Sequence, residues 1–166
     1  MEEKWLEDAK AGNLKDMKEI CQRLRSHGLL QEVKRFKDSD GDTALSLATI
    51  KGHLDICQFL VREDLVDVNN RNVIGFNALH NAAIKNRPEI AKWLLEETSI
   101  DVNEQDDCGY TALHWVVDCN CLEITRILLK YKPRNLKNER GETALDGARK
   151  HNNEEIIQLL KRHYNI

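Results

Sequence analysis

A five-residue motif occurs four times along this chain of 166 residues, at a nearly constant spacing. Each copy reads Gly, any residue, Thr or Asn, Ala, Leu. Successive copies start 34, 34 and 32 residues apart, at Gly41, Gly75, Gly109 and Gly141. A period of this length is typical of repeat architectures, because one unit cannot bury its apolar face alone and must stack on its neighbours. The chain is therefore expected to fold as one row of stacked units.

The residues inside each unit predict two helices. A side-chain oxygen at the third motif position can accept a hydrogen bond from a free amide of the first helical turn. The four residues at that position are Thr43, Asn77, Thr111 and Thr143. Thirteen residues later comes an Ile and, four residues after it, a Leu, which a second helix would place on one face. Each unit is thus expected to contain a turn, a short helix, a second turn and a longer helix.

Several longer motifs identify the kind of repeat. Residues 77–83 read Asn-Ala-Leu-His-Asn-Ala-Ala, residues 111–114 read Thr-Ala-Leu-His, and Asp-Val-Asn occurs at residues 67–69 and 101–103. In this phase the units resemble ankyrin repeats. The resemblance implies an all-α ankyrin-repeat solenoid, in which stacked helix-turn-helix units are joined by β-hairpin-like turns.

The spacing divides residues 1–166 into one domain of five repeats. The boundaries lie at approximately 1–37 for a degenerate N-terminal repeat, then 38–71, 72–105, 106–137 and 138–166, the last being a C-terminal cap. An insertion around residues 26–36 is left without an assigned conformation. Ser46 and Asp146 replace the motif His, and we expect weaker turns there.

The composition limits the cellular compartments and the classes of partner that we expect for this protein. Hydrophobic residues make up 41% of the chain, no apolar run has membrane-spanning length, and the first residues lack the charge pattern of a secretory signal. The cysteine count is odd, at five, which favours reduced thiols. We therefore expect a cytoplasmic or nuclear monomer without a membrane partner. The formal net charge of -3 provides no overall basic field for nucleic acid.

No motif in the sequence indicates an active site or a bound metal. The chain has no Gly-rich phosphate loop and no nucleophile motif. His80 and His114 occupy the position at which the resemblance implies a structural hydrogen bond between turns. The pair Cys119 and Cys121, even with Cys108 nearby, gives a weak metal pattern. We expect no catalytic residue, no metal and no cofactor.

The resemblance implies a protein-protein interaction module, an adaptor or an inhibitor, that binds through its turn tips and the concave face of its first helices. Large apolar residues gather at these positions in repeats 3 and 4, and such residues often carry binding energy. The predicted partner-binding residues are Leu47, Val73, Ile74, Phe76, Asn81, Tyr110 and Trp115. In the alternative interpretation, Phe76 and Tyr110 pack on each other as local support.

Three further alternatives stay open at this point. The domain could sense a nucleotide or oligonucleotide, with Trp115 stacking on a base and Lys51 or Lys85 meeting phosphate. It could also be a pathogen or viral effector that uses the same surface on a host protein. Separately, the segment from Leu95 to Asn103 resembles ankyrin segments that an asparaginyl hydroxylase modifies, which makes Asn103 a candidate hydroxylation site.

Overall fold

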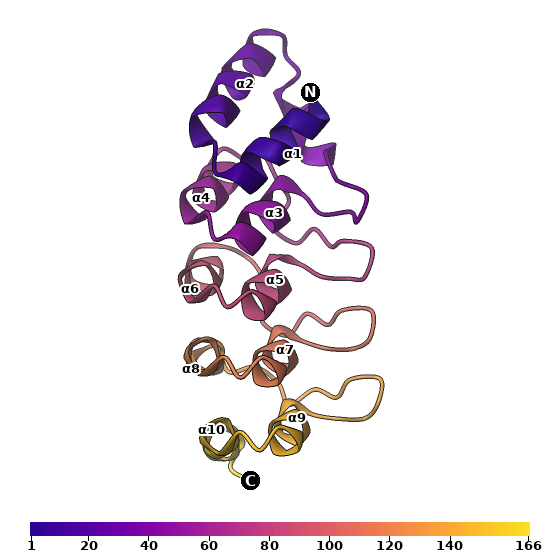
Figure 1. Cartoon of the computed structure of the whole chain (residues 1–166), viewed down its shortest axis with the longest axis vertical. Coiled ribbons are helices and arrows are strands. Elements are labelled where there is room, and N and C mark those ends of the chain that lie inside the picture. The colour runs from indigo at the N-terminus through magenta and orange to yellow at the C-terminus, as the bar shows by residue number, and fades with distance from the viewer.

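The computed structural model describes all residues, 1–166, as two columns of helices (Figure 1). The inner helices are α1 (Glu2–Ala11), α3 (Ala44–Lys51), α5 (Ala78–Ile84), α7 (Ala112–Asp118) and α9 (Ala144–Lys150). The outer helices are α2 (Leu14–Ser26), α4 (Leu54–Arg62), α6 (Pro88–Glu97), α8 (Leu122–Lys130) and α10 (Glu154–Tyr164). Turns project from one side of the stack. The expected all-α solenoid is confirmed.

Local chemistry starts and stops the inner helices where the repeat predicts. Asn77 is the N-cap of α5, and its Oδ1 accepts from the backbone N–H of Leu79 and of His80, both at 3.0 Å. At the other end a left-handed residue turns the chain toward the outer helix, for example Gly52 at φ 91° and Asn86 at φ 51°. Pro88 then opens α6, where a missing N–H costs no hydrogen bond.

The core lies between the two columns and runs the length of the stack. Forty buried hydrophobic residues form a single cluster that includes residues from every helix pair. The inner helices approach one another closely because small residues such as Ala48 and Ala82 face their neighbours, and both are fully buried. Val116 and Val117 replace the small pair in α7 and are also fully buried. The stack is therefore one continuous unit stabilised mainly by apolar burial.

The tips, which are the turns that precede α3, α5, α7 and α9, share one hydrogen-bonding scheme. An Asp or Asn three residues before the motif Gly accepts, through its side-chain Oδ1, from the backbone N–H groups two and four residues later. These residues are Asp38, Asn72, Asp106 and Asn138. The side chain thereby forms a turn that the backbone alone would hold less firmly. One antiparallel bridge, from Gln105 to Thr111, confirms the hairpin-like geometry.

Neighbouring tips are also joined to each other by the backbone. Val73 N–H donates to the carbonyl oxygen of Asp40 at 3.0 Å, and Asp107 N–H donates to that of Ile74 at 3.3 Å. Glu139 N–H continues the series to Cys108 at 3.0 Å. The position of each tip is therefore set by the repeat on either side of it.

The insertion before the second helix pair forms a 3-10 helix, η1 (Leu30–Arg35). Its Val33 is buried, and its Lys34 Nζ lies 2.7 Å from Asp64 Oδ2 at the end of the next repeat. The segment is thus packed on the stack. Across the whole chain, none of the helices combines the length and the apolar character that crossing a membrane would need.

Candidate protein-binding surface

The tip of the third repeat exposes two adjacent apolar side chains, which we call the tip ridge. Val73 is 67% exposed and Ile74 is 52% exposed. The Val73 N–H and the Ile74 carbonyl both bond to neighbouring tips, so the backbone of the ridge is held from two sides while its side chains stay free. Of the predicted partner-binding residues, these two are the most accessible.

Three aromatic side chains lie between this tip and the inner helices, and we call them the aromatic cluster. The ring centroid of Trp115 is 5.4 Å from that of Phe76 and 5.2 Å from that of Tyr110. Such distances are typical of favourable aromatic pairs. All three side chains are partly buried. Phe76 and Tyr110 therefore pack on Trp115 and on the histidines His80 and His114, and not on each other as the alternative interpretation had it.

Asp106 holds the aromatic cluster in place. Its Oδ2 accepts a hydrogen bond from Trp115 Nε1 at 2.9 Å, while its Oδ1 accepts from the backbone N–H groups of Cys108 and Tyr110. Asp106 is 6% exposed. One buried carboxylate thus fixes both the tip of the fourth repeat and the indole. Asp106 is not among the residues predicted from the sequence, although an Asp or Asn three residues before each motif Gly indicates a side chain that stabilises the turn.

Two predicted partner-binding residues are largely covered in the structure. Leu47 is 8% exposed and Asn81 is 5% exposed, so each offers little surface to a partner. Leu47 lines an open groove of about 590 Å³ beside α1. Both occupy the inner-helix position equivalent to Trp115, which is partly exposed. Asn81 Nδ2 is buried and has no hydrogen-bond acceptor in the protein.

His80 and His114 connect one repeat to the next. His80 Nε2 lies 3.1 Å from the carbonyl oxygen of Tyr110, and His114 Nε2 lies 3.2 Å from that of Glu142. In His114, Nδ1 accepts from the backbone N–H of Thr111, so Nε2 carries the proton. Burial lowers the pKa of both rings, which favours the neutral form. Their geometry is that of structural bridges.

We expect acid to destabilise the fold through these two histidines. Because their pKa is lower in the folded state, the unfolded chain binds more protons once the pH falls below about 6.5, and stability declines from there. A loss of about 1 kcal/mol per histidine between pH 7 and pH 5 is expected. Urea unfolding at the two pH values measures it. A His80→Gln, His114→Gln variant whose stability falls as steeply would contradict this account.

One carboxyl group works against this trend at lower pH. Burial raises the pKa of Asp42, so its ionised form destabilises the fold, and this destabilisation is relieved as the pH falls through the folded pKa toward the unfolded value, opposite to the histidines. An Asp42→Asn background therefore isolates the contribution of the imidazole bridges.

The two repeats without the motif His differ from each other. Asp146 still caps its helix, because its Oδ2 accepts from the Thr143 N–H at 2.9 Å. Ser46 reaches only within its own turn, and no side-chain bond equivalent to the His80 bridge joins it to the third repeat. That junction is instead closed by Asn72 Nδ2, which donates to Asp42 Oδ1 at 3.2 Å.

The cysteines do not form a common site. All five thiols are free. The Cys119 thiol points to the carbonyl oxygen of Ile84, whereas the Cys121 thiol points to that of Cys119. Burial raises the pKa of Cys57 to about 12, which makes that thiol unreactive at neutral pH. No group of three or more His, Cys, Asp or Glu side chains is arranged to hold a metal ion.

Asn103 takes part in the connection between the third and fourth repeats. Its Oδ1 accepts from the Arg134 N–H at 2.6 Å, and its Nδ2 donates to Asp101 Oδ1 at 3.2 Å. These bonds give the side chain a structural role. Its hydroxylation stays a prediction.

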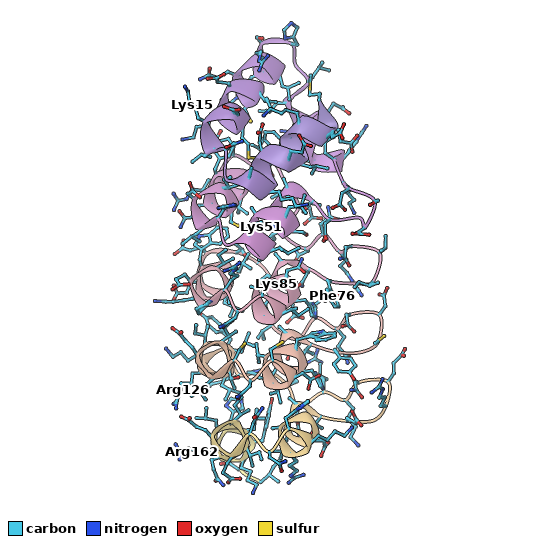
Figure 2. All side chains as sticks on the ribbon, in the orientation of Figure 1. Lys15, Lys51, Phe76, Lys85, Arg126 and Arg162 are labelled. Carbon is cyan, nitrogen blue, oxygen red and sulfur yellow. The ribbon has the colours of Figure 1, made fainter.

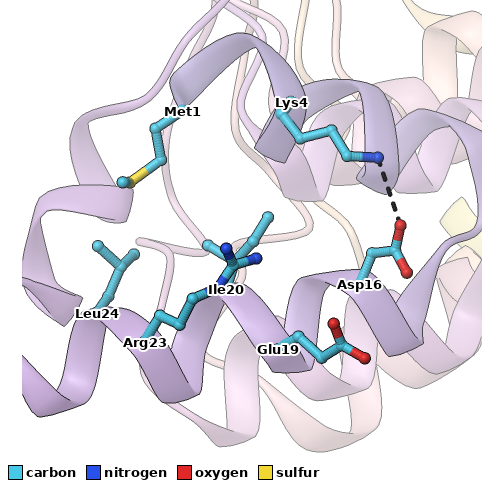
Figure 3. Close-up of a pocket in the computed structure, with 7 residues that line it drawn as sticks. All are labelled: Met1, Lys4, Asp16, Glu19, Ile20, Arg23 and Leu24. Carbon is cyan, nitrogen blue, oxygen red and sulfur yellow. Dashed lines mark hydrogen bonds and ion pairs between the residues drawn. The ribbon is translucent and has the colours of Figure 1, made fainter.

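One hollow of the surface lies away from the predicted site, and another lies at its edge. A cleft of about 340 Å³ opens between α1 and α2 at the N-terminal end of the stack (Figure 3). It mixes cations with carboxylates, and Lys4 Nζ lies 3.4 Å from Asp16 Oδ2 across it. A smaller cleft of about 120 Å³ lies beside Tyr110, above Gly147, and is lined mainly by polar groups. Neither presents the enclosed apolar cavity typical of small-molecule sites.

Comparison with known proteins agrees with the helix pairs, the capped inner helices and the linked tips. A family model of ankyrin repeats in three copies matches residues 9–106 and again residues 99–166. A search of curated proteins gave no match. The two family matches together span nearly the whole chain, which therefore belongs to the ankyrin repeat family.

Proposed function

We propose that this protein binds another protein through the tip ridge and the aromatic cluster, as an adaptor or an inhibitor. Ankyrin repeats are generally protein-protein interaction modules. One observation carries the choice of surface. The exposed large hydrophobic residues are Met1, Leu29, Val73, Ile74 and Ile166. Of these, only Val73 and Ile74 are adjacent, and only they lie in a regular tip. Grouped exposed apolar side chains mark interaction sites, whereas single ones are ordinary.

The surface is well prepared for binding because its backbone is already ordered. The tip ridge bonds to both neighbouring tips, and Asp106 positions Trp115 beneath it. A rigid surface loses little conformational entropy when a partner docks. The proposed mechanism is therefore rigid presentation of an apolar surface by a monomer. The free thiols fit a reducing compartment, so we place the protein in the cytoplasm or nucleus.

The structure changes which variant tests this proposal best. Trp115 is partly buried and hydrogen-bonded, so replacing it would also disturb the fold. Val73→Ser with Ile74→Ser removes exposed apolar surface and leaves the core intact. We expect this variant to lose bound proteins in a pulldown from lysate and to bind the isolated partner at least about tenfold more weakly.

Leu29→Ser is the matched control, since Leu29 is 49% exposed and lies outside the regular tips. Proteins captured by the wild type and by the control, but not by the double variant, would support the proposal. Identical captured proteins for all three chains would exclude the tip ridge as the interface. Circular dichroism and urea unfolding check that all three chains are folded.

A base stacked on Trp115 is a less favourable reading of the same surface. Phe76 and Tyr110 already pack against the indole, and Asp106 occupies its N–H. A base could reach a ring face only by displacing one of these neighbours. We therefore rank nucleotide sensing below protein binding.

A further inference from the structure

We propose that the segment bound at the tip ridge is acidic: an extended stretch of the partner whose carboxylates pair with Lys51 and Lys85 while an apolar side chain covers the ridge. This inference rests on the proposed function and names the chemistry of its partner. It draws on what the inner helices expose beside the aromatic cluster.

The second and third repeats expose almost nothing of their inner helices except two lysines. In α3 every residue from Ala44 to Thr49 is buried, Ile50 is partly buried and Lys51 is exposed. In α5 the pattern is the same, with Ile84 partly buried and Lys85 exposed at the C-cap. Figure 2 shows both lysines on the inner helix column, with Phe76 between that column and the tips. A ligand crossing this face therefore meets two cations and apolar side chains.

No carboxylate of the protein neutralises these cations. Neither Lys51 nor Lys85 has an acidic oxygen within ion-pair distance, whereas two acidic side chains near this face are already engaged. Asp107 pairs with Arg71 at 2.9 Å, and Asp118 lies 3.4 Å from His151. Asp40 is exposed without a cation and lies in the tip that bonds to Val73, so the acidic residues of the segment belong over the inner helices and not over the ridge. Charge complementarity thus favours an anionic segment along the inner helices.

The distance between the two lysines determines how far apart the carboxylates of the bound segment must be. Packed helices lie about 8–10 Å apart, so equivalent residues on α3 and α5 are separated by roughly that distance. An extended chain advances about 3.3 Å per residue, so carboxylates three residues apart would meet both lysines. Val73 and Ile74 lie beyond the opposite end of α5 from Lys85, since the helix rises about 1.5 Å per residue from Asn77 to Lys85 and the tip adds three residues. The ridge is therefore roughly 20 Å from this lysine, and an extended segment would place its apolar residue about six residues from the acidic pair.

The test is selection from a displayed library of random 12-residue peptides, followed by affinity measurements on the enriched peptides. Four chains are compared. They are the wild type, Lys51→Glu with Lys85→Glu, the ridge variant Val73→Ser with Ile74→Ser, and Lys15→Glu with Arg162→Glu. The last is matched in charge change, and its residues lie on the outer helices (Figure 2). A 12-nucleotide oligothymidylate is measured alongside.

We expect wild-type peptides to be rich in Asp and Glu three residues apart, with an apolar residue about six residues from that pair. Charge reversal at Lys51 and Lys85 should weaken their binding about tenfold or more at low salt, and less at high salt, with the outer-helix control unchanged. Peptides without an acidic excess, or equal loss in the outer-helix control, would overturn the inference. Tighter binding of the oligonucleotide, lost with Lys51 and Lys85, would overturn it in favour of nucleic acid.

The ridge variant separates this inference from the proposed function. Peptides that need the ridge but lack acidic residues would refute the charge inference and leave the function standing. Enriched peptides that bind the ridge variant as well as the wild type would refute both.

Discussion

Replacing Gly75 by alanine is expected to destabilise the protein by about 3 kcal/mol, most of it through the neighbouring repeat. Gly75 has φ 82°, and a Cβ built there would lie 2.6 Å from the backbone nitrogen of Asp107. The left-handed conformation costs alanine about 1 kcal/mol relative to glycine. The clash with backbone adds strain of about 1–3 kcal/mol, since the tip of the fourth repeat must move.

Gly141→Ala is the matched control, because Gly141 has the same backbone conformation but no neighbouring tip beside it. Gly141 has φ 75°, but no atom lies within 4 Å of its added Cβ, because it belongs to the last tip. We expect this variant to lose only about 1 kcal/mol. Urea unfolding of the two variants measures the difference. Equal losses would show that the contact between tips contributes nothing to the cost.

Asp106→Ala is expected to cost about 3 kcal/mol or more, because it leaves three donors without their acceptor. The carboxylate accepts from two backbone N–H groups of its own tip and from the Trp115 indole. Hydrogen bonds to a charged group are worth about 1.5–3 kcal/mol each, and water recovers part of the loss at an open turn. Chemical denaturation gives the free energy of unfolding.

Asn138→Ala distinguishes the contribution of the backbone bonds in the tip from that of the indole bond. Asn138 accepts the same two backbone bonds in the last tip but no indole bond. We expect a loss of about 1–2 kcal/mol there. A double-mutant cycle of Asp106→Ala with Trp115→Phe should show a coupling of about 1 kcal/mol or more. Independent effects of the two substitutions would mean that the indole bond does not stabilise the fold.

The period and the caps carried most of the fold prediction. Thr43 and Asn77 do cap their helices, and the four tips do form hairpin-like turns. Such features depend on residues close in sequence, so a local pattern is enough to predict them. The 3-10 helix at Leu30–Arg35 was not predicted, because no equivalent segment in the other repeats offered a comparison.

The candidate surface was only partly predictable, because exposure depends on the size of neighbouring side chains. The repeat placed Val73 and Ile74 in the middle of a tip, between Asn72 and the helix, where both side chains are exposed. It also placed Leu47 and Asn81 on the inner face, yet these shorter side chains are covered and only Trp115 emerges. The Asp106 bond to the indole joins residues from a turn and a helix, and periodicity alone does not indicate a contact of that kind.

The junction between the second and third repeats has a kinetic consequence. The third and fourth repeats each bond to the following repeat through a buried imidazole. The second repeat is joined to the third instead by Asn72, which donates to Asp42, and by the Arg87 guanidinium, which donates to the Ile50 carbonyl oxygen at 3.0 Å. Because Asn72 and Arg87 are only half-buried, water competes with these bonds more than with the imidazole bridges.

In a stack where each repeat contacts only its neighbours, partial opening starts at the weakest interface. Residues 1–71 are therefore expected to separate from the third repeat as one unit before the remaining repeats unfold. Amide hydrogens on either side of the junction between the second and third repeats should then exchange faster than those at the other junctions. Lys51 and Ile74 lie on opposite sides of this junction. A ligand that contacts both would hold the two repeats together and slow amide hydrogen exchange there.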